Sequence, residues 1–188
     1  MQKIILASQS PRRKQLLEWA EIPLEIIVSE ADETYPPDLP IDDIPVFIAR
    51  KKAEAVKRKL SGDKIILAAD TIVVLEDKVI GKPATRAEAI EILRSLSGKN
   101  HRVITGVVLL NRDKEIGFSD TTQVIFHTLT DEQITFYVDN YQPYDKAGAY
   151  AIQEWIGVVG IRSINGDFYN VMGLPVSRVV RELQKLNG

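Results

Sequence analysis

The sequence predicts an α/β fold built on a long, twisted, mixed β-sheet that is flanked by helices. Strand-like and helix-like segments alternate along the 188 residues, a pattern typical of this class. Two long β-rich runs are separated only by residues 111–114, which predicts a hairpin, and Asn165-Gly166 is a strong turn signal. We therefore expect antiparallel pairs within the sheet, and the pattern disfavours a purely parallel, doubly wound arrangement.

Apolar runs predict six strands, and proline or threonine at helix starts predicts five helices. The expected strands are 3–7, 24–28, 64–75, 101–110, 115–128 and 157–164. The expected helices begin at Pro11, Pro45, Thr85, Thr130 and Pro175. Two starts carry the capping-box pattern, Thr85 with Glu88 and Thr130 with Gln133.

The bulk composition is that of an ordinary globular protein, with 45% hydrophobic and 27% charged residues. The length suits a single domain over residues 1–188. A net charge of −2 gives no basic field, so nucleic acid is not an expected partner. The absence of cysteine excludes disulfides, thiolate metal sites and cysteine nucleophiles.

Targeting and membrane signals are weak throughout the chain. The apolar run at residues 4–7 is too short for the core of a signal peptide, and no stretch approaches the length needed to span a bilayer. The two histidines lie far apart, which disfavours a multi-histidine zinc site. We expect a cytoplasmic protein with no membrane partner.

A serine-flanked turn after the first strand has the character of an anion site. Ser10, two positions beyond Ser8, stands where an N-cap belongs, and Pro11 stands where the first helical residue belongs. The free N–H groups and the dipole of such a helix attract an anion. Arg12 and Arg13 add forked donors that suit phosphate oxygens. The alternative is an ordinary capped helix with two solvated arginines.

Asp70 is the second feature that requires an explanation. It interrupts a run of apolar residues, 65–75, that is typical of a buried strand. An ionised carboxylate there costs several kcal/mol unless a cation or strong donors compensate it. A structural ion pair would meet that condition, and so would a metal-binding or general-base role.

The helix expected at Pro45 offers a cation on the side of its apolar stripe. That stripe follows helical spacing and consists of Val46, Ala49, Ala53, Val56 and Leu60. At about 100° per residue, Lys51 points away from the stripe and should be solvated. Lys52 lies on its flank, from where it reaches either a cleft or the solvent.

Three further positions are weak signals when taken singly. Glu33 belongs to an acidic cluster with Glu30 and Asp32, which is ordinarily a solvated loop. Lys82, between a glycine and a proline, fits an exposed lysine in a turn. His101 is more often a structural histidine than a catalyst.

Taken together, six motifs resemble one known family in order and spacing. They are Ser8-Gln9-Ser10-Pro11-Arg12-Arg13, Ala68-Ala69-Asp70-Thr71, Gly81-Lys82-Pro83, Ser97-Gly98 with His101 and Thr105-Gly106, Asp145-Lys146-Ala147-Gly148, and Gly173-Leu174-Pro175. This order is similar to that of the Maf-like nucleoside triphosphate pyrophosphatases, and the match covers essentially the whole chain. The resemblance implies the Maf and inosine triphosphatase type of architecture.

The resemblance also implies an activity. It is the hydrolysis of dTTP and UTP to the monophosphate and pyrophosphate, a house-cleaning role, with Mg²⁺ or Mn²⁺ as cofactor and homodimerisation as an option. Asp70 matches the family's proton acceptor, and three positions match those linked to base selection: Arg12, Thr71 and Gln153. A sister branch acting on methylated guanine nucleotides carries tryptophan where this chain has Arg12, so the arginine indicates the pyrimidine branch.

These assignments form one hypothesis for the site. The expected phosphate-binding residues are Ser8, Ser10, Arg13, Lys52 and Lys82, and the expected metal ligands are Asp70 and Glu33. Charge neutralisation and positioning are what transfer of a phosphoryl group to water needs. The alternative is a nucleotide-binding regulatory protein of cell division or septum formation without significant turnover. An RNA-binding module is disfavoured by the acidic balance and the lack of an evident stacking platform.

Overall fold

The computed structural model describes residues 2–112 and 114–187. Within them, seven strands form a mixed sheet in the order β2-β1-β3-β5-β6-β7, with β4 paired to β3. β1 is parallel to β2 and β3, whereas β3/β4 and β6/β7 are antiparallel. The mixed sheet with flanking helices expected from the sequence is confirmed.

The chain divides into two compact units. Unit 1 comprises Met1–Asp70, Thr105–Asp120 and Gly173–Gly188, and unit 2 comprises Thr71–Ile104 and Thr121–Met172. Three long strands contribute residues to both units: β3 (Ile65–Leu75), β5 (Asn100–Asn111) and β6 (Lys114–Phe126). No helix within the described ranges is long and apolar enough to cross a membrane.

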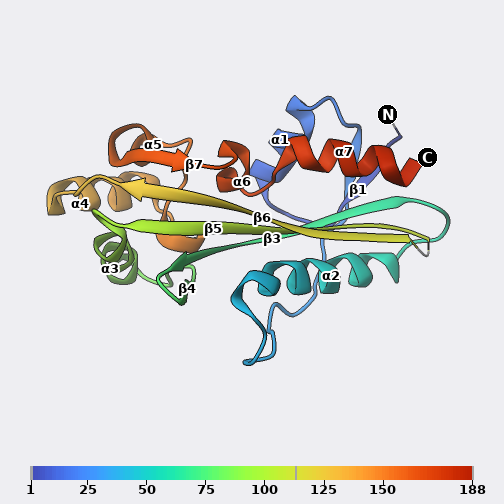
Figure 1. The fold of residues 1–188 in the computed structure, drawn as a ribbon, viewed down its shortest axis with the longest axis horizontal. Coiled ribbons are helices and arrows are strands. Elements are labelled where there is room, and N and C mark those ends of the chain that lie inside the picture. Colours follow the sequence, from blue (N-terminus) through green and yellow to red (C-terminus); the bar gives the residue numbers. More distant parts are fainter. Residues whose placement is uncertain (1, 113, 188) are drawn as a thin grey trace. The chain divides into compact units, whose positions relative to one another are not determined.

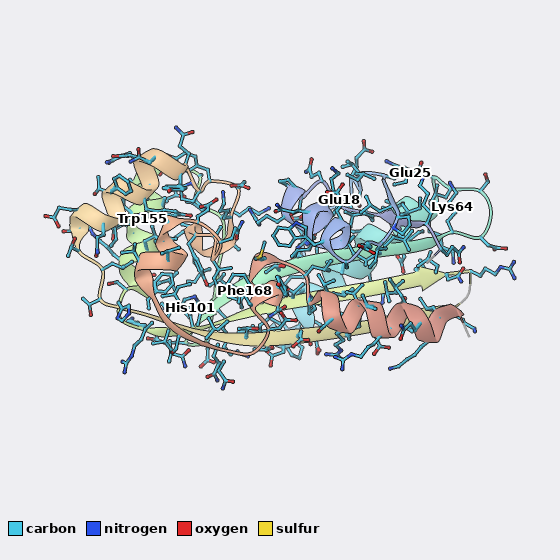
Figure 2. All side chains as sticks on the ribbon, turned by 90° about the horizontal axis from the view of Figure 1, so that it is seen from above. Glu18, Glu25, Lys64, His101, Trp155 and Phe168 are labelled. Carbon is cyan, nitrogen blue, oxygen red and sulfur yellow. The ribbon has the colours of Figure 1, made fainter. Side chains whose placement is uncertain are left out.

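Unit 1 places helices on both faces of its strands. Its further elements are β1 (Ile4–Leu6), α1 (Pro11–Trp19), β2 (Leu24–Ile26), a short 3-10 turn (Ile41–Asp43), α2 (Ile44–Lys57) and α7 (Val176–Asn187). α2 lies on one side of the strands, and α1 and α7 lie on the other (Figure 1). At the strand edge, Glu25 on β2 lies beside Lys64 (Figure 2), with 4.0 Å between the charged atoms.

The core of unit 1 follows from strand alternation. Ile5 packs with Ala49 and Ala53 of α2, so Ile4 and Leu6, also buried, point to the opposite face. β5 runs so close to the start of α2 that a Cβ on Gly106 would lie 2.2 Å from the carbonyl carbon of Pro45. Only glycine permits this approach, and it fixes the helix that carries Lys52.

Unit 2 is built from short elements around the remaining parts of the long strands. They are β4 (Lys78–Ile80), α3 (Arg86–Leu96), α4 (Asp131–Tyr141), a 3-10 turn (Ala147–Ala149), α5 (Trp155–Gly160), β7 (Ile161–Asn165) and α6 (Phe168–Met172). One apolar cluster joins Leu93 of α3, Val138 of α4 and Phe126 of β6. The Trp155 ring of α5 (Figure 2) packs against the Phe136 ring of α4, with 4.8 Å between ring centroids.

Both threonine caps expected from the sequence are present. Thr130 forms the complete capping box with Gln133. Thr85 accepts from the backbone N–H of Glu88, but the Glu88 carboxylate accepts from the N–H of Ala84, one residue earlier than the capping box places it.

The predicted strand 157–164 is wrong in its first half. Residues 155–160 form α5, and only β7 is a strand. A Cβ on Gly157 would lie 1.7 Å from the carbonyl oxygen of Ile152, so the backbone coils tightly here. A short apolar run does not distinguish a buried strand from a buried helix. Likewise, the Asn165-Gly166 turn leads from β7 into α6 and not into another strand.

The expected hairpin at residues 111–114 joins β5 and β6, which are neighbours in the sheet. Residue 113 lies outside the described residues.

Candidate functional site

The turn after β1 leaves the start of α1 without a side-chain cap among the described residues. Ser10 occupies the N-cap position and Pro11 the first helical position, as expected, but the Ser10 side chain makes no capping hydrogen bond. The Ser8 hydroxyl instead accepts from the backbone N–H of Ser10 at 3.2 Å and from Nη1 of Arg13 at 3.3 Å. Ser8 therefore fixes the turn and the arginine together.

Arg13 is buried, with 9% of its surface exposed, so the expectation of two solvated arginines is wrong for this residue. Its Nε donates to the carbonyl oxygen of Gly173 at 2.9 Å. Burial lowers the pKa of Arg13, and the negative charges of Asp70 and Glu33 oppose that shift. The guanidinium thus lies within electrostatic range of both carboxylates. Arg12, which adds a second positive charge, is half-buried.

Lys52 joins the two carboxylates that the sequence proposed as metal ligands. Its Nζ lies 2.7 Å from Oδ1 of Asp70 and 2.6 Å from Oε1 of Glu33. The side chains of Lys52 and Asp70 are 12% and 13% exposed, whereas that of Glu33 is 54% exposed. Lys52 therefore reaches inward from the flank of α2, and Glu33 is part of this cluster and not only of a solvated loop.

Asp70 lies where β3 changes from buried to half-buried residues, and its charge is compensated there. Residues 65–69 of β3 are buried, and Asp70 and Thr71 are half-buried. Lys52 supplies the cation that an ionised carboxylate in such a strand requires. The structural ion pair expected as one explanation for Asp70 is therefore present, between Asp70 and Lys52. Because Asp70 keeps some exposure, it is also accessible to a ligand.

The donor set fits a divalent cation that is shared with a phosphate. Asp70 and Glu33 converge on one ammonium, so their oxygens lie next to each other. Within the described ranges no three histidine, cysteine or acidic side chains cluster to hold a metal. Mg²⁺ commonly binds through one or two carboxylates, with substrate phosphates and water as its other ligands. The residues therefore suit such a site and not a cage made by the protein alone.

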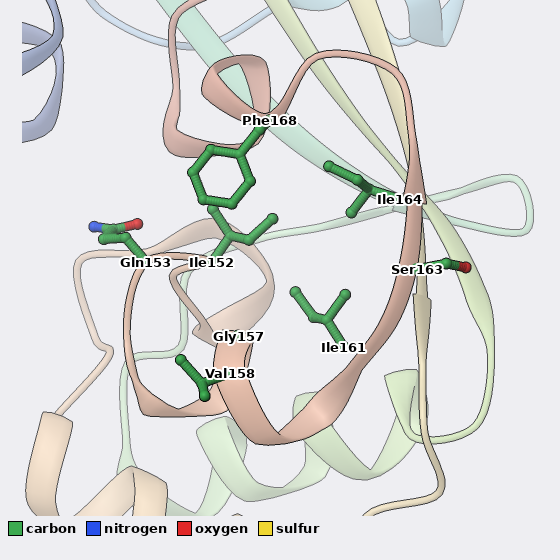
Figure 3. A pocket seen from close by; sticks show the side chains of 8 residues that line it. All are labelled: Ile152, Gln153, Gly157, Val158, Ile161, Ser163, Ile164 and Phe168. Carbon is green, nitrogen blue, oxygen red and sulfur yellow. The ribbon is translucent and has the colours of Figure 1, made fainter.

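The other expected residues belong to unit 2. Thr71 is half-buried in β3, and Lys82 is exposed between β4 and α3. Gln153 is exposed just before α5 and lines a hollow of about 510 Å³ (Figure 3). The remaining lining residues are mostly apolar: Ile152, Gly157, Val158, Ile161, Ser163, Ile164 and Phe168.

Sequence reasoning missed this hollow and a second cluster of charges. Lys146 is buried, with its Nζ 2.7 Å from Oδ1 of Asp145 and 3.6 Å from Oε1 of Glu154. The Glu154 carboxylate also accepts from the hydroxyl of Tyr137. The motif at residues 145–148 was a usable signal for Lys146, whereas nothing in the sequence pairs Glu154 with Tyr137.

His101 has a structural position, as its residue type suggests. It is buried, its Nε2 lies 2.7 Å from the hydroxyl of Tyr150, and burial lowers its pKa to about 4. Burial also raises the pKa of Tyr150. Both side chains are therefore neutral near pH 7.

Comparisons with known proteins identify the family of the chain. Residues 3–186 match the family described as Maf-like protein. A protein from Parabacteroides distasonis named dTTP/UTP pyrophosphatase is 51% identical over 183 residues, 97% of this chain and 95% of that protein. A protein of the same name from Bacillus anthracis is 51% identical over 187 residues, 100% of this chain and 97% of that protein.

A solved structure is also similar in fold. It is described as a HAM1 protein from Coxiella burnetii, with a TM-score of 0.50 and 18% identity over 97% of this chain and 100% of that one. The likeness supports the expected architecture. The match over residues 3–186 and the half-identical relatives settle the family: the chain belongs to the Maf-like proteins.

Proposed function

We propose that this protein is a nucleoside triphosphate pyrophosphatase that hydrolyses dTTP and UTP to the monophosphate and pyrophosphate. The observation that carries the proposal is the contact of Lys52 with Asp70 and Glu33, within electrostatic range of the buried Arg13. The printed name of relatives about 50% identical over nearly the whole chain supports the same activity. The substrate follows from those names and from Arg12.

The triphosphate is an anion of about four charges, and the residues of unit 1 are suited to bind it. The guanidinium of Arg13 suits phosphate oxygens, and the positive end of the α1 dipole favours an anion beside it. When Asp70 or Glu33 contacts another cation in place of Lys52, the ammonium of Lys52 is available to a phosphate oxygen. Ser8, Ser10 and Arg12 are the other proposed phosphate-binding residues of unit 1, and Lys82 is the one proposed in unit 2.

Asp70 is the proposed general base. It orients a water for in-line attack and takes one of its protons as the new oxygen–phosphorus bond forms at the α-phosphorus. The bond from the α-phosphorus to its bridging oxygen breaks, and pyrophosphate leaves with that oxygen. Asp70 and Glu33 would hold a divalent cation, Mg²⁺ or Mn²⁺, which when bound would neutralise phosphate charge and lower the pKa of water. Lys52 holds the carboxylate of Asp70 in place before substrate binds.

Gln153 is the proposed reader of the base, together with Thr71 and Arg12. Its amide can donate to O4 of uracil or thymine and accept from N3–H. The same amide, turned by 180°, matches the reversed pattern of cytosine. Selection against CTP therefore requires that something fixes the orientation of the amide or supplies a donor of fixed polarity.

A panel of nucleoside triphosphates, assayed for pyrophosphate release with Mg²⁺ and with Mn²⁺, tests the proposal. We expect release from dTTP and UTP and much slower release from purine nucleotides. Tight binding of nucleotides without release of pyrophosphate from any of them would favour the regulatory alternative and overturn the enzymatic one.

A further inference from the structure

The turn that carries Gln153 is closed by its own backbone. The N–H of Glu154 donates to the carbonyl oxygen of Ala151 at 3.1 Å, and the N–H of Gly157 donates to that of Glu154 at 2.9 Å. Because a Cβ on Gly157 would overlap Ile152, the turn is also tightly packed. Gln153 itself remains exposed at the rim of the apolar hollow (Figure 3).

One hydroxyl connects the two ends of this turn. The N–H of Ala151 donates to Oη of Tyr137 at 3.1 Å, and the same hydroxyl donates to the carboxylate of Glu154. The bridge therefore spans the residues on either side of the pair Ile152-Gln153. Tyr137 lies on α4, is fully buried, and stacks on Tyr141 with 4.9 Å between ring centroids.

The carboxylate in the bridge is held in turn by a lysine. Nζ of Lys146 lies 3.6 Å from the second oxygen of Glu154, and Lys146 is itself buried. Glu154 thus has one oxygen on Tyr137 and the other beside a cation. Because the Glu154 carboxylate is held on both sides, the O–H bond of Tyr137 has one preferred direction, toward Glu154. The lone pairs of the hydroxyl oxygen then face the N–H of Ala151.

We propose that Tyr137 is a positioning residue for base selection, because its hydroxyl fixes the turn from which Gln153 extends. The proposal rests on the proposed role of Gln153. A turn tied at both ends fixes the position of the Gln153 backbone, and with it the distance and angle at which its amide meets the base. Tyr137 does not touch the substrate.

Loss of the hydroxyl has a specific expected effect. Tyr137→Phe keeps the buried ring and its stacking but removes the bridge, so the backbone position from which Gln153 reaches the base is no longer fixed. We expect KM for UTP to rise about fivefold to tenfold, the factor of one ordinary hydrogen bond. The preference for UTP over CTP should fall by a similar factor, while kcat for UTP stays within about twofold.

The chain offers a matched control on the same helix. Tyr141→Phe removes a hydroxyl from the ring that stacks on Tyr137, in a residue that is partly exposed. We expect its KM and its UTP/CTP ratio to match those of the unmodified protein. Glu154→Gln keeps an acceptor for Tyr137 and should preserve most of the preference. Glu154→Ala removes the acceptor and should reproduce the effect of Tyr137→Phe, even where the tyrosine variant folds poorly.

Steady-state kinetics of these variants with UTP and CTP, together with Gln153→Ala, decide the matter. If Gln153→Ala leaves the UTP/CTP ratio unchanged, the proposed role of Gln153 fails and this inference fails with it. If Gln153→Ala lowers the ratio while Tyr137→Phe and Glu154→Ala behave like Tyr141→Phe, only the positioning role is overturned. A fall of kcat without a change in the ratio would also contradict it.

Discussion

Two helices of unit 2 and one helix of unit 1 begin in different ways. In unit 2, α3 and α4 start at Thr85 and Thr130, whose side chains accept from the backbone of the first turn. In unit 1, α1 starts at Ser10, which makes no side-chain cap. A side-chain cap satisfies a backbone donor and stabilises its helix, and α1 lacks the cap that Ser10 could supply. Our proposal assigns the first turn of α1 in unit 1 to phosphate binding and the threonine caps of unit 2 to stability.

Two lysines whose side chains are little exposed show a second contrast. Lys52 in unit 1 and Lys146 in unit 2 each lie beside two carboxylates. In unit 2, Glu154 is also hydrogen-bonded by a buried tyrosine, so the cluster braces a turn. In unit 1, the carboxylate of Asp70 interrupts an apolar strand and keeps some exposure. We therefore propose that similar charges serve stability in unit 2 and chemistry in unit 1.

Removing the ammonium of Lys52 in unit 1 should lower the rate strongly. Lys52→Met keeps the aliphatic length but leaves Asp70 and Glu33 without their shared partner. We expect kcat/KM for UTP to fall by about 10²–10³, as for the loss of a charged group that stabilises a transition state. Lys51→Met is the control, because Lys51 contacts the carbonyl of Thr34 and is more exposed. A drop of similar size in both variants would remove the distinction.

Acid should weaken unit 2 through His101. Its pKa is about 4 in the folded protein, against about 6.5 when unfolded, so the unfolded chain binds the extra proton between these values. This contribution to the free energy of unfolding is intact above pH 6.5 and is lost as the pH falls toward 4. The full loss is about 3 kcal/mol.

Urea unfolding of the parent protein and of His101→Gln, from pH 8 to pH 4.5, measures this contribution. Glutamine keeps a polar partner for Tyr150 but does not titrate in this range. The difference between the two proteins should change with pH. Parallel stability curves would show that His101 does not titrate in the way its burial requires.

The helix caps give the smallest effect and the most direct comparison of the two units. Thr130→Ala removes a complete capping box and should cost about 1 kcal/mol of unfolding free energy. Ser10→Ala removes no capping hydrogen bond and should change stability by less than about 0.5 kcal/mol. Thermal unfolding of both variants provides the test. An equal loss in both would mean that Ser10 caps α1 in solution.

Much of unit 1's site was predictable because its signals are local. A carboxylate inside an apolar strand and a lysine on the flank of an amphipathic helix identified Asp70 and Lys52 before any geometry was known. That both meet Glu33 was not predictable from residue patterns alone, because an acidic loop is ordinarily solvated and its path depends on tertiary packing. The sequence analysis named Glu33 only as a metal ligand beside Asp70, and did not expect its contact with Lys52.

The details of unit 2 were less predictable because they depend on contacts between short elements. The apolar run that forms α5 gave no periodicity strong enough to separate helix from strand. The bridge from Tyr137 to Glu154 requires that α4 and the turn before α5 face each other. By contrast, both threonine caps were found from sequence, because a cap needs only residues within one turn.

The most direct test of this division compares the same chemical change in the two units. Asp70→Asn and Glu154→Gln each convert a lysine-paired carboxylate to its amide, and kcat for pyrophosphate release from UTP is measured for both. We predict that Asp70→Asn lowers kcat by about 10³ while UTP still binds, and that Glu154→Gln stays within about twofold of the parent. Comparable rates in the two variants would contradict the assignment of catalysis to unit 1.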